Sequence, residues 1–140
     1  MRYTRDSSEW DELVAAGREI LAELARDRRE ADYTAFAALL HERTKLPSLV
    51  FPQDRGTVGD LLADISELGR EEHPELLLSV LVHARATGAP GEGFYALARH
   101  HGLLSEGAGD AEKYRLLDKQ VKGLRAHYSP LRRRTDAGRP

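Results

Sequence analysis

The six histidines are the residues of this sequence best suited to hold a metal ion, and their spacing argues against it. His100 and His101 are adjacent in a predicted helix, where successive side chains point about 100° apart and do not converge on one ion. The remaining histidines, none of which has a second ligand at helical spacing, are His41, His73, His83 and His127. We therefore expect no metal site and no cofactor.

Groups for acid–base or nucleophilic catalysis are scattered along the chain. No nucleophile elbow of the G-x-S-x-G type occurs, and the absence of cysteine excludes thiol nucleophiles, disulfides and thiolate-held metals. The acidic residues Glu71, Glu72 and Glu75 surround Pro74 at a predicted helix end, where a solvated boundary explains them better than a paired-carboxylate site. We predict that the protein is not an enzyme.

A glycine-rich turn precedes one predicted helix and could present backbone amides to a phosphate. It contains Gly88, Gly91 and Gly93, but no Walker lysine follows, the dinucleotide-binding spacing is absent, and Glu92 would repel a phosphate. A tight turn with positive backbone torsions is therefore the preferred interpretation of these glycines.

Charge is unevenly distributed between the two ends of the chain. Residues 111–140 hold nine Lys or Arg against three Asp or Glu, a net charge of +6, whereas residues 1–110 hold twelve against twenty, a net charge of −8. A basic last helix and tail suit phosphate contacts, and they equally suit docking on the acidic body or on an acidic partner. The candidate nucleic-acid-binding residues are Arg55, Thr57, Lys119, Lys122, Arg125, Arg132, Arg133 and Arg134.

Hydrophobic periodicity predicts the elements that would position these groups. Helices are expected over about 8–28, 35–42, from 57 until Gly69 or Pro74, 94–102 and 110–129, with N-caps that include Ser8, Thr34 and Thr57. Two short apolar runs, 49–51 and 76–82, are predicted to pair as strands. The sequence thus indicates a mainly α fold of about five helices with a very small two-stranded sheet, of which a winged-helix-like arrangement is one form.

Length and composition indicate one domain. The chain has 140 residues, of which 41% are hydrophobic and 31% charged, so we expect a single helical domain over 1–130 and a flexible basic tail over 131–140. The longest apolar run, 76–82, is far shorter than the roughly 20 residues that a membrane span needs. The first twelve residues do not resemble a secretory signal, and we expect a cytoplasmic protein.

Two segments carry a resemblance to known families. The apolar run Leu78–Val82 and the turn Gly88–Tyr95 resemble a pattern in small uncharacterised bacterial proteins, an apolar strand followed by P-G-x-G-F at a helix start. This likeness covers about 33–104 and implies no activity. More loosely, the order of helices from Tyr33 and Thr57 before that strand resembles the winged-helix part of alkyltransferase-like DNA-binding proteins. Their alkyl-accepting P-C-H-R motif is absent here, which excludes alkyl transfer.

Two functions are therefore carried forward. The first is a non-enzymatic, winged-helix-like protein that binds nucleic acid, and the alternative is a protein-interaction module of antitoxin-like or immunity-like type. The last helix also carries one apolar stripe, Tyr114, Leu117, Val121, Leu124 and Tyr128. Because it spans only about two heptads, the stripe is more typical of a seam against the protein's own core than of a homodimer interface, and both interpretations stay open.

Overall fold

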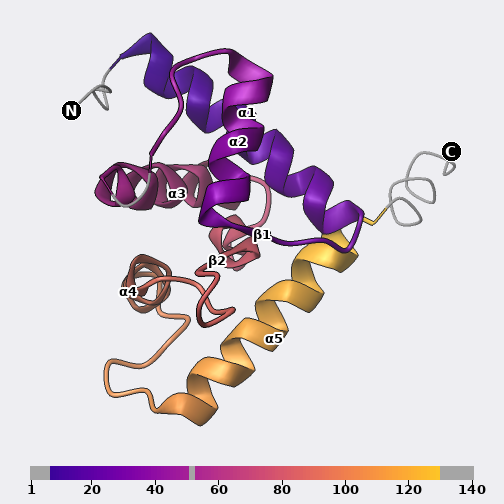
Figure 1. Cartoon of the computed structure of the whole chain (residues 1–140). Coiled ribbons are helices and arrows are strands. Elements are labelled where there is room, and N and C mark those ends of the chain that lie inside the picture. The colour runs from indigo at the N-terminus through magenta and orange to yellow at the C-terminus, as the bar shows by residue number, and fades with distance from the viewer. Residues whose placement is uncertain (1–6, 51–52, 130–140) are drawn as a thin grey trace, which may run out of the picture.

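Five α-helices, one 3₁₀-helix and a two-stranded sheet form the described part of the chain, residues 7–50 and 53–129 of the computed structural model (Figure 1). The mainly α fold with a tiny sheet is confirmed. In chain order the elements are α1 (Ser8–Arg26), β1 (Ala31–Asp32), α2 (Tyr33–Thr44), α3 (Arg55–Arg70), the 3₁₀-helix η1 (Leu78–Leu81), β2 (Val82–His83), α4 (Glu92–His100) and α5 (Asp110–His127).

The hydrophobic core lies where α1 packs against α3 and where both helices cover η1. The two helices approach closely at Gly17 of α1, where a Cβ atom would collide with the Ile65 side chain. Ile65 has no exposed surface. The long helix α5 runs along the outside of the molecule and contributes Leu124, which is also buried, to the same core (Figure 1).

The two strands differ from the predicted ones. β1 and β2 run parallel, with Ala31 opposite Val82 and Asp32 opposite His83. The predicted partner strand is wrong in its described residues, since Leu49 and Val50 lie in an irregular segment, and Phe51 falls outside the described residues. A wing is an antiparallel hairpin, whereas the sheet found within 7–50 and 53–129 is parallel, so these strands do not support a winged helix.

The apolar run Leu76–Val82 is buried throughout, but it does not form the predicted strand. Most of the run belongs to η1, and its last residue enters β2. Side chains take the place of a neighbouring strand: the amide of Gln120 bonds to the backbone at two points, and Ser66 accepts a hydrogen bond from the backbone N–H of Ser79 at 3.0 Å. Backbone groups satisfied in this way need no ladder.

Three helices begin at or before their predicted caps. The N-cap of α1 is Ser7 rather than Ser8, and its hydroxyl accepts a hydrogen bond from the Trp10 N–H at 3.1 Å. The N-cap of α2 is Asp32 rather than Thr34, and its carboxylate accepts a hydrogen bond from the Ala35 N–H at 2.7 Å. Similarly, α3 begins at Arg55, so that Thr57 lies inside the helix with a buried side chain. Among the described residues, no helix combines the length and hydropathy that crossing a membrane requires.

Candidate functional site

A cleft of about 640 Å³ opens where the first turns of α2, α3 and α4 meet. We call it the α2–α4 cleft. The cleft is lined, among other residues, by Tyr33 of α2, Arg55 and Gly59 of α3, Arg85 after β2, and Glu92 and Gly93 of α4. The chain leaves both β1 and β2 into this cleft, so the cleft lies at the carboxyl ends of parallel strands, a common place for ligands in α/β folds.

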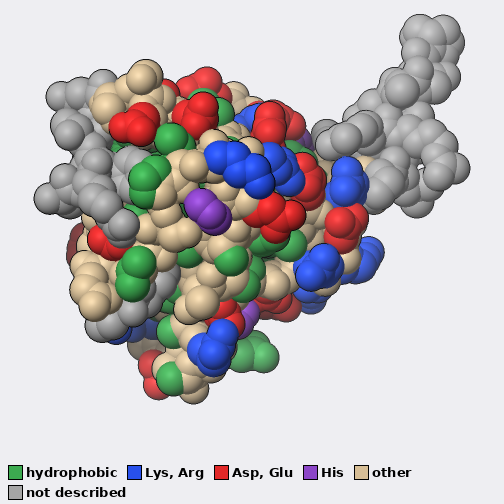
Figure 2. Space-filling model, turned by 45° about the horizontal axis from the view of Figure 1, so that its top comes forward, with side chains coloured by type: hydrophobic (Ala, Val, Ile, Leu, Met, Phe, Trp, Pro, Cys, Tyr) green, Lys and Arg blue, Asp and Glu red, His purple; other side chains and the backbone are tan. Residues whose placement is uncertain are grey.

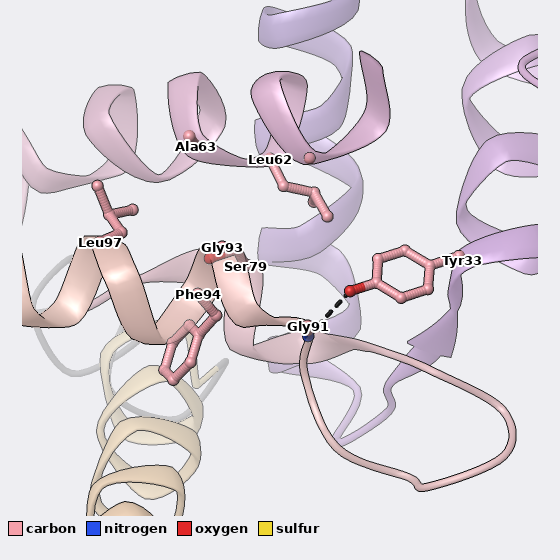
Figure 3. Close-up of a pocket in the computed structure, with 9 residues that line it drawn as sticks. Tyr33, Leu62, Ala63, Ser79, Gly91, Gly93, Phe94 and Leu97 are labelled. Atoms are coloured by element: carbon pink, nitrogen blue, oxygen red, sulfur yellow. Dashed lines mark hydrogen bonds between the residues drawn. The ribbon is translucent and has the colours of Figure 1, made fainter. Parts of the chain in front are cut away.

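One hydrogen bond fixes the wall between α2 and α4. The hydroxyl of Tyr33 accepts a hydrogen bond from the Gly91 N–H at 2.9 Å, and Figure 3 shows the phenol ring pointing directly at this turn. A Cβ atom on Gly91 would lie 2.5 Å from the same hydroxyl oxygen. The glycine that opens the P-G-x-G-F turn is therefore required by Tyr33 and not by a positive torsion, because its φ is −76°.

Of the three glycines assigned to a turn with positive torsions, Gly88 has such a conformation, with φ of +69°. Neither Gly91 nor Gly93 shares it, so the prediction is wrong for these two. Gly93 lies inside α4, and a Cβ atom there would meet nothing within 4 Å. The same is true of Gly59 inside α3. The fold itself therefore requires a glycine at neither position.

Four charged side chains line the α2–α4 cleft. Arg85 forms an ion pair with Asp32 at 3.0 Å, and the hydrogen bond from Ala35 together with this guanidinium lowers the pKa of Asp32. Neither Arg55 nor Glu92 makes a hydrogen bond or ion pair with any of the described residues. The cleft thus holds one internally neutralised pair and two charges of opposite sign that stay open to a ligand.

The predicted nucleic-acid-binding residues fall into separate places. Lys119 and Lys122 are exposed on α5, where Lys122 pairs with Asp118 at 3.0 Å. Arg125 is turned toward the protein and lies 3.7 Å from the Glu30 carboxylate. Arg55 lines the α2–α4 cleft, to which α5 contributes no residue. The buried Thr57 is not presented to a ligand, and Arg132, Arg133 and Arg134 lie outside the described residues.

Sequence reasoning missed one further cation on the outer side of α5, Arg115. Arg115 stands four residues before Lys119, and Lys122 follows three residues later, so all three share one side of the helix. Tyr114, beside them, is 74% exposed. The spacing of four and three was visible in the sequence, and it could have identified Arg115. We call these four residues the basic face of α5.

The apolar stripe of α5 faces mainly inward. Leu124 and Tyr128 belong to the core, Leu117 and Val121 are partly buried against it, and Tyr114 is exposed. The seam interpretation therefore describes most of the stripe. Its buried side also contains Gln120, which is 2% exposed and which no hydrophobic pattern could reveal.

The histidines serve structural contacts. His101 lies 2.6 Å from the Glu67 carboxylate, and His127 lies 2.6 Å from that of Glu72, so each joins its helix to the end of α3 or to the turn that follows. No group of three or more potential metal ligands gathers within 7–50 and 53–129. The arrangement offers ion pairs and hydrogen bonds rather than a coordination sphere.

Surface charges are mixed on the face seen in Figure 2, where acidic and basic side chains alternate and the hydrophobic patches are small and separate.

Comparison with known proteins identifies no relative: no family model matches the chain, and neither the curated proteins nor the solved structures contain a significant match. The function must therefore be argued from the surfaces themselves.

Proposed function

We propose that the protein is a non-enzymatic, cytoplasmic nucleic-acid-binding protein that uses the basic face of α5. One observation carries the proposal: three cations, Arg115, Lys119 and Lys122, lie exposed along one side of a helix beside the exposed ring of Tyr114. Cations in a row neutralise successive phosphates and release their counterions, which supplies most of the affinity of non-specific binding.

The contacts of these side chains are compatible with an exchange of partners. The pair between Lys122 and Asp118 joins two exposed side chains that are 74% and 55% accessible, and such pairs contribute little to stability. A phosphate can therefore replace the carboxylate at small cost. An exposed tyrosine next to cations is also suited to stacking on an unpaired base, which favours single strands over duplexes.

Fluorescence anisotropy of labelled single-stranded and duplex DNA, titrated over a salt series, tests the proposal. We expect the double variant Lys119→Gln/Lys122→Gln to bind all sequences more weakly and to lower the slope of log K against log salt by about 1.4 to 1.8. The matched control Arg28→Gln/Lys45→Gln removes the same charge from exposed positions elsewhere. Equal losses in both variants, or no binding at low salt, would contradict the proposal.

The predicted basic tail is tested in the same titration. A chain shortened after Tyr128 lacks Arg132, Arg133 and Arg134, and it should show a further decrease in slope if these residues contact phosphates. An unchanged slope would remove the tail from the binding surface and leave α5 alone.

The alternative function, a protein-interaction module, finds less support in the surface. Among the described residues, the exposed large hydrophobic side chains are Val50, in the irregular segment before α3, and Tyr114, on α5. Stable protein interfaces usually centre on a larger apolar patch. A homodimer through the stripe of α5 would also compete with the core for Leu124 and Tyr128.

A further inference from the structure

We propose that the α2–α4 cleft is a nucleotide-binding site, which takes a phosphate on its arginines and a flat base against its glycine walls. This site is separate from the basic face of α5, because no residue of α5 lines the cleft. The proposal therefore goes beyond nucleic-acid binding by α5, and it does not depend on it.

The arginines identify the anionic part of the ligand. The guanidinium of Arg55 has no partner among the described residues, and the side chain of Arg85 is 78% exposed although Asp32 holds one end of it. Guanidinium groups bind phosphate oxygens through paired N–H donors, and a phosphate monoester near neutral pH carries close to two negative charges. Arg55 and the part of the Arg85 guanidinium that Asp32 leaves free are therefore the donors available to a phosphate.

The glycines identify the shape of the ligand. Glycine inside a helix destabilises it relative to alanine, and a Cβ atom on Gly59 or Gly93 would meet no other atom within 4 Å. The isolated fold thus gains nothing from these two glycines, although both line the cleft. Their bare backbone leaves room for a planar group to lie against α3 and α4, as a base would.

The remaining charge identifies a hydrogen-bond donor on the ligand. Glu92 has no hydrogen-bond or ion-pair partner among the described residues, and it would repel a bare phosphate. Its carboxylate can accept hydrogen bonds from the exocyclic amino group of adenine, cytosine or guanine, whereas uracil has no such group. The volume of about 640 Å³ lies within the range of sites that bind molecules of this size.

A nucleoside monophosphate can reach the cleft free or as the phosphorylated end of a strand. The two sources share the same chemistry, and competition separates them. If a 5′-phosphorylated oligonucleotide displaces AMP at lower concentration than its unphosphorylated counterpart does, the strand end is the ligand. If neither displaces AMP, the free nucleotide is the ligand. Both outcomes support a nucleotide site in the cleft.

The experiment is a titration of the isotope-labelled full chain with AMP, CMP, GMP, UMP and inorganic phosphate, followed by amide chemical shifts. We expect saturable shifts at Tyr33, Gly59, Gly91 and Gly93 with the first three nucleotides, and binding about tenfold weaker with UMP. The variant Glu92→Gln should reduce the preference over UMP. Absence of saturable shifts in the cleft with all four nucleotides would overturn the proposal.

Matched variants test the walls and the arginine. Gly56→Leu and Gly59→Leu change two exposed glycines of α3 that both face open space, of which only Gly59 lines the cleft. We expect both variants to fold, with AMP binding lost in Gly59→Leu and kept in Gly56→Leu. Arg55→Gln should weaken AMP binding about tenfold. Equal effects of the two glycine variants would overturn the proposed wall.

The variant Lys119→Gln/Lys122→Gln separates this site from the proposed function. AMP binding should be unchanged in it, even where binding to DNA is lost. Conversely, the DNA titration can fail while AMP still binds in the cleft. A loss of AMP binding in the α5 variant would show that the nucleotide binds on α5, and it would overturn the assignment to the cleft.

Discussion

Gln120 offers the sharpest test of how the fold is held together, because its buried amide joins α5 to the chain before η1. Its Oε1 accepts a hydrogen bond from the Leu77 N–H at 2.7 Å, and its Nε2 donates to the Glu75 carbonyl at 2.7 Å. Gln120 is 2% exposed and Leu77 has no exposed surface. The substitution Gln120→Met keeps the length and volume of the side chain while it removes both hydrogen bonds.

The magnitude follows from what each lost bond leaves behind. The Leu77 N–H stays buried without a partner, which costs about 1–3 kcal/mol, whereas the carbonyl of the exposed Glu75 can find water and loses about 0.5–1.5 kcal/mol. The added hydrophobic surface of methionine offsets a part of this loss. We therefore expect the free energy of unfolding to fall by about 1–4 kcal/mol.

Urea unfolding measures this loss, followed by the fluorescence of Trp10, which is the single tryptophan and is 2% exposed. The matched control is Gln53→Met at the other glutamine, which is exposed and should change stability by less than about 0.5 kcal/mol. A loss below that same limit in Gln120→Met would refute the idea that this amide holds the run 76–82 in place.

Substitutions at Asp32, at Gly17 and in the apolar stripe of α5 test other parts of the structure. Asp32→Ala should cost about 0.5–2 kcal/mol through the lost cap of α2. Because hydrogen bonding lowers the folded-state pKa of Asp32, its contribution is complete above the ordinary pKa and is lost as pH falls through the lowered one. The difference in free energy of unfolding between wild type and Asp32→Asn should therefore be largest above about pH 4 and should shrink as pH falls below it. Gly17→Ala should lower the stability of the protein by about 1–3 kcal/mol, because the added methyl group overpacks the contact of α1 with α3. Thermal unfolding measures this loss, and the control variant Gly56→Ala should lose no stability. Leu124→Asp places a charge in the core and should unfold the protein, whereas Leu117→Asp should still fold. Light scattering checks the oligomeric state: a dimeric wild type whose Leu124→Asp variant is a folded monomer would support the homodimer interface on α5.

The helices were predictable because each carries its own signal. The buried residues of α1 include Trp10, Leu13 and Leu24, which recur at helical spacing, and α3 shows the same period around Leu61 and Ile65. The period fixes which side of a helix is buried, although it does not fix the cap. Asp32 and Thr34 are both good caps, and the structure uses Asp32, which also pairs with Arg85 across the cleft.

The sheet was not predictable, because the strands are only two residues long and lie far apart in the chain. Ala31 and Asp32 show no alternating pattern, and the run that does look like a strand, Leu76–Val82, is satisfied by side chains of α3 and α5 instead. The polar residues that decide this, Ser66 and Gln120, look like surface residues in the sequence. Tertiary hydrogen bonds thus override the local pattern.

The α2–α4 cleft could not be predicted from the sequence for a related reason. It is formed by segments around residues 33, 55–59, 85 and 91–93, which no local sequence pattern connects. The structure also divides the glycines into two classes that look alike in the sequence. Gly17, Gly69 and Gly91 lie where a Cβ atom would press on Ile65, Leu78 or Tyr33, so packing explains them. Gly59 and Gly93 have no such neighbour, although a glycine in the interior of a helix, as at Gly59, destabilises it by up to about 1 kcal/mol relative to alanine. Both of these glycines line the same cleft as Arg55, which has no partner among the described residues, whereas Gly56 of α3, which also faces open space, lies outside the cleft.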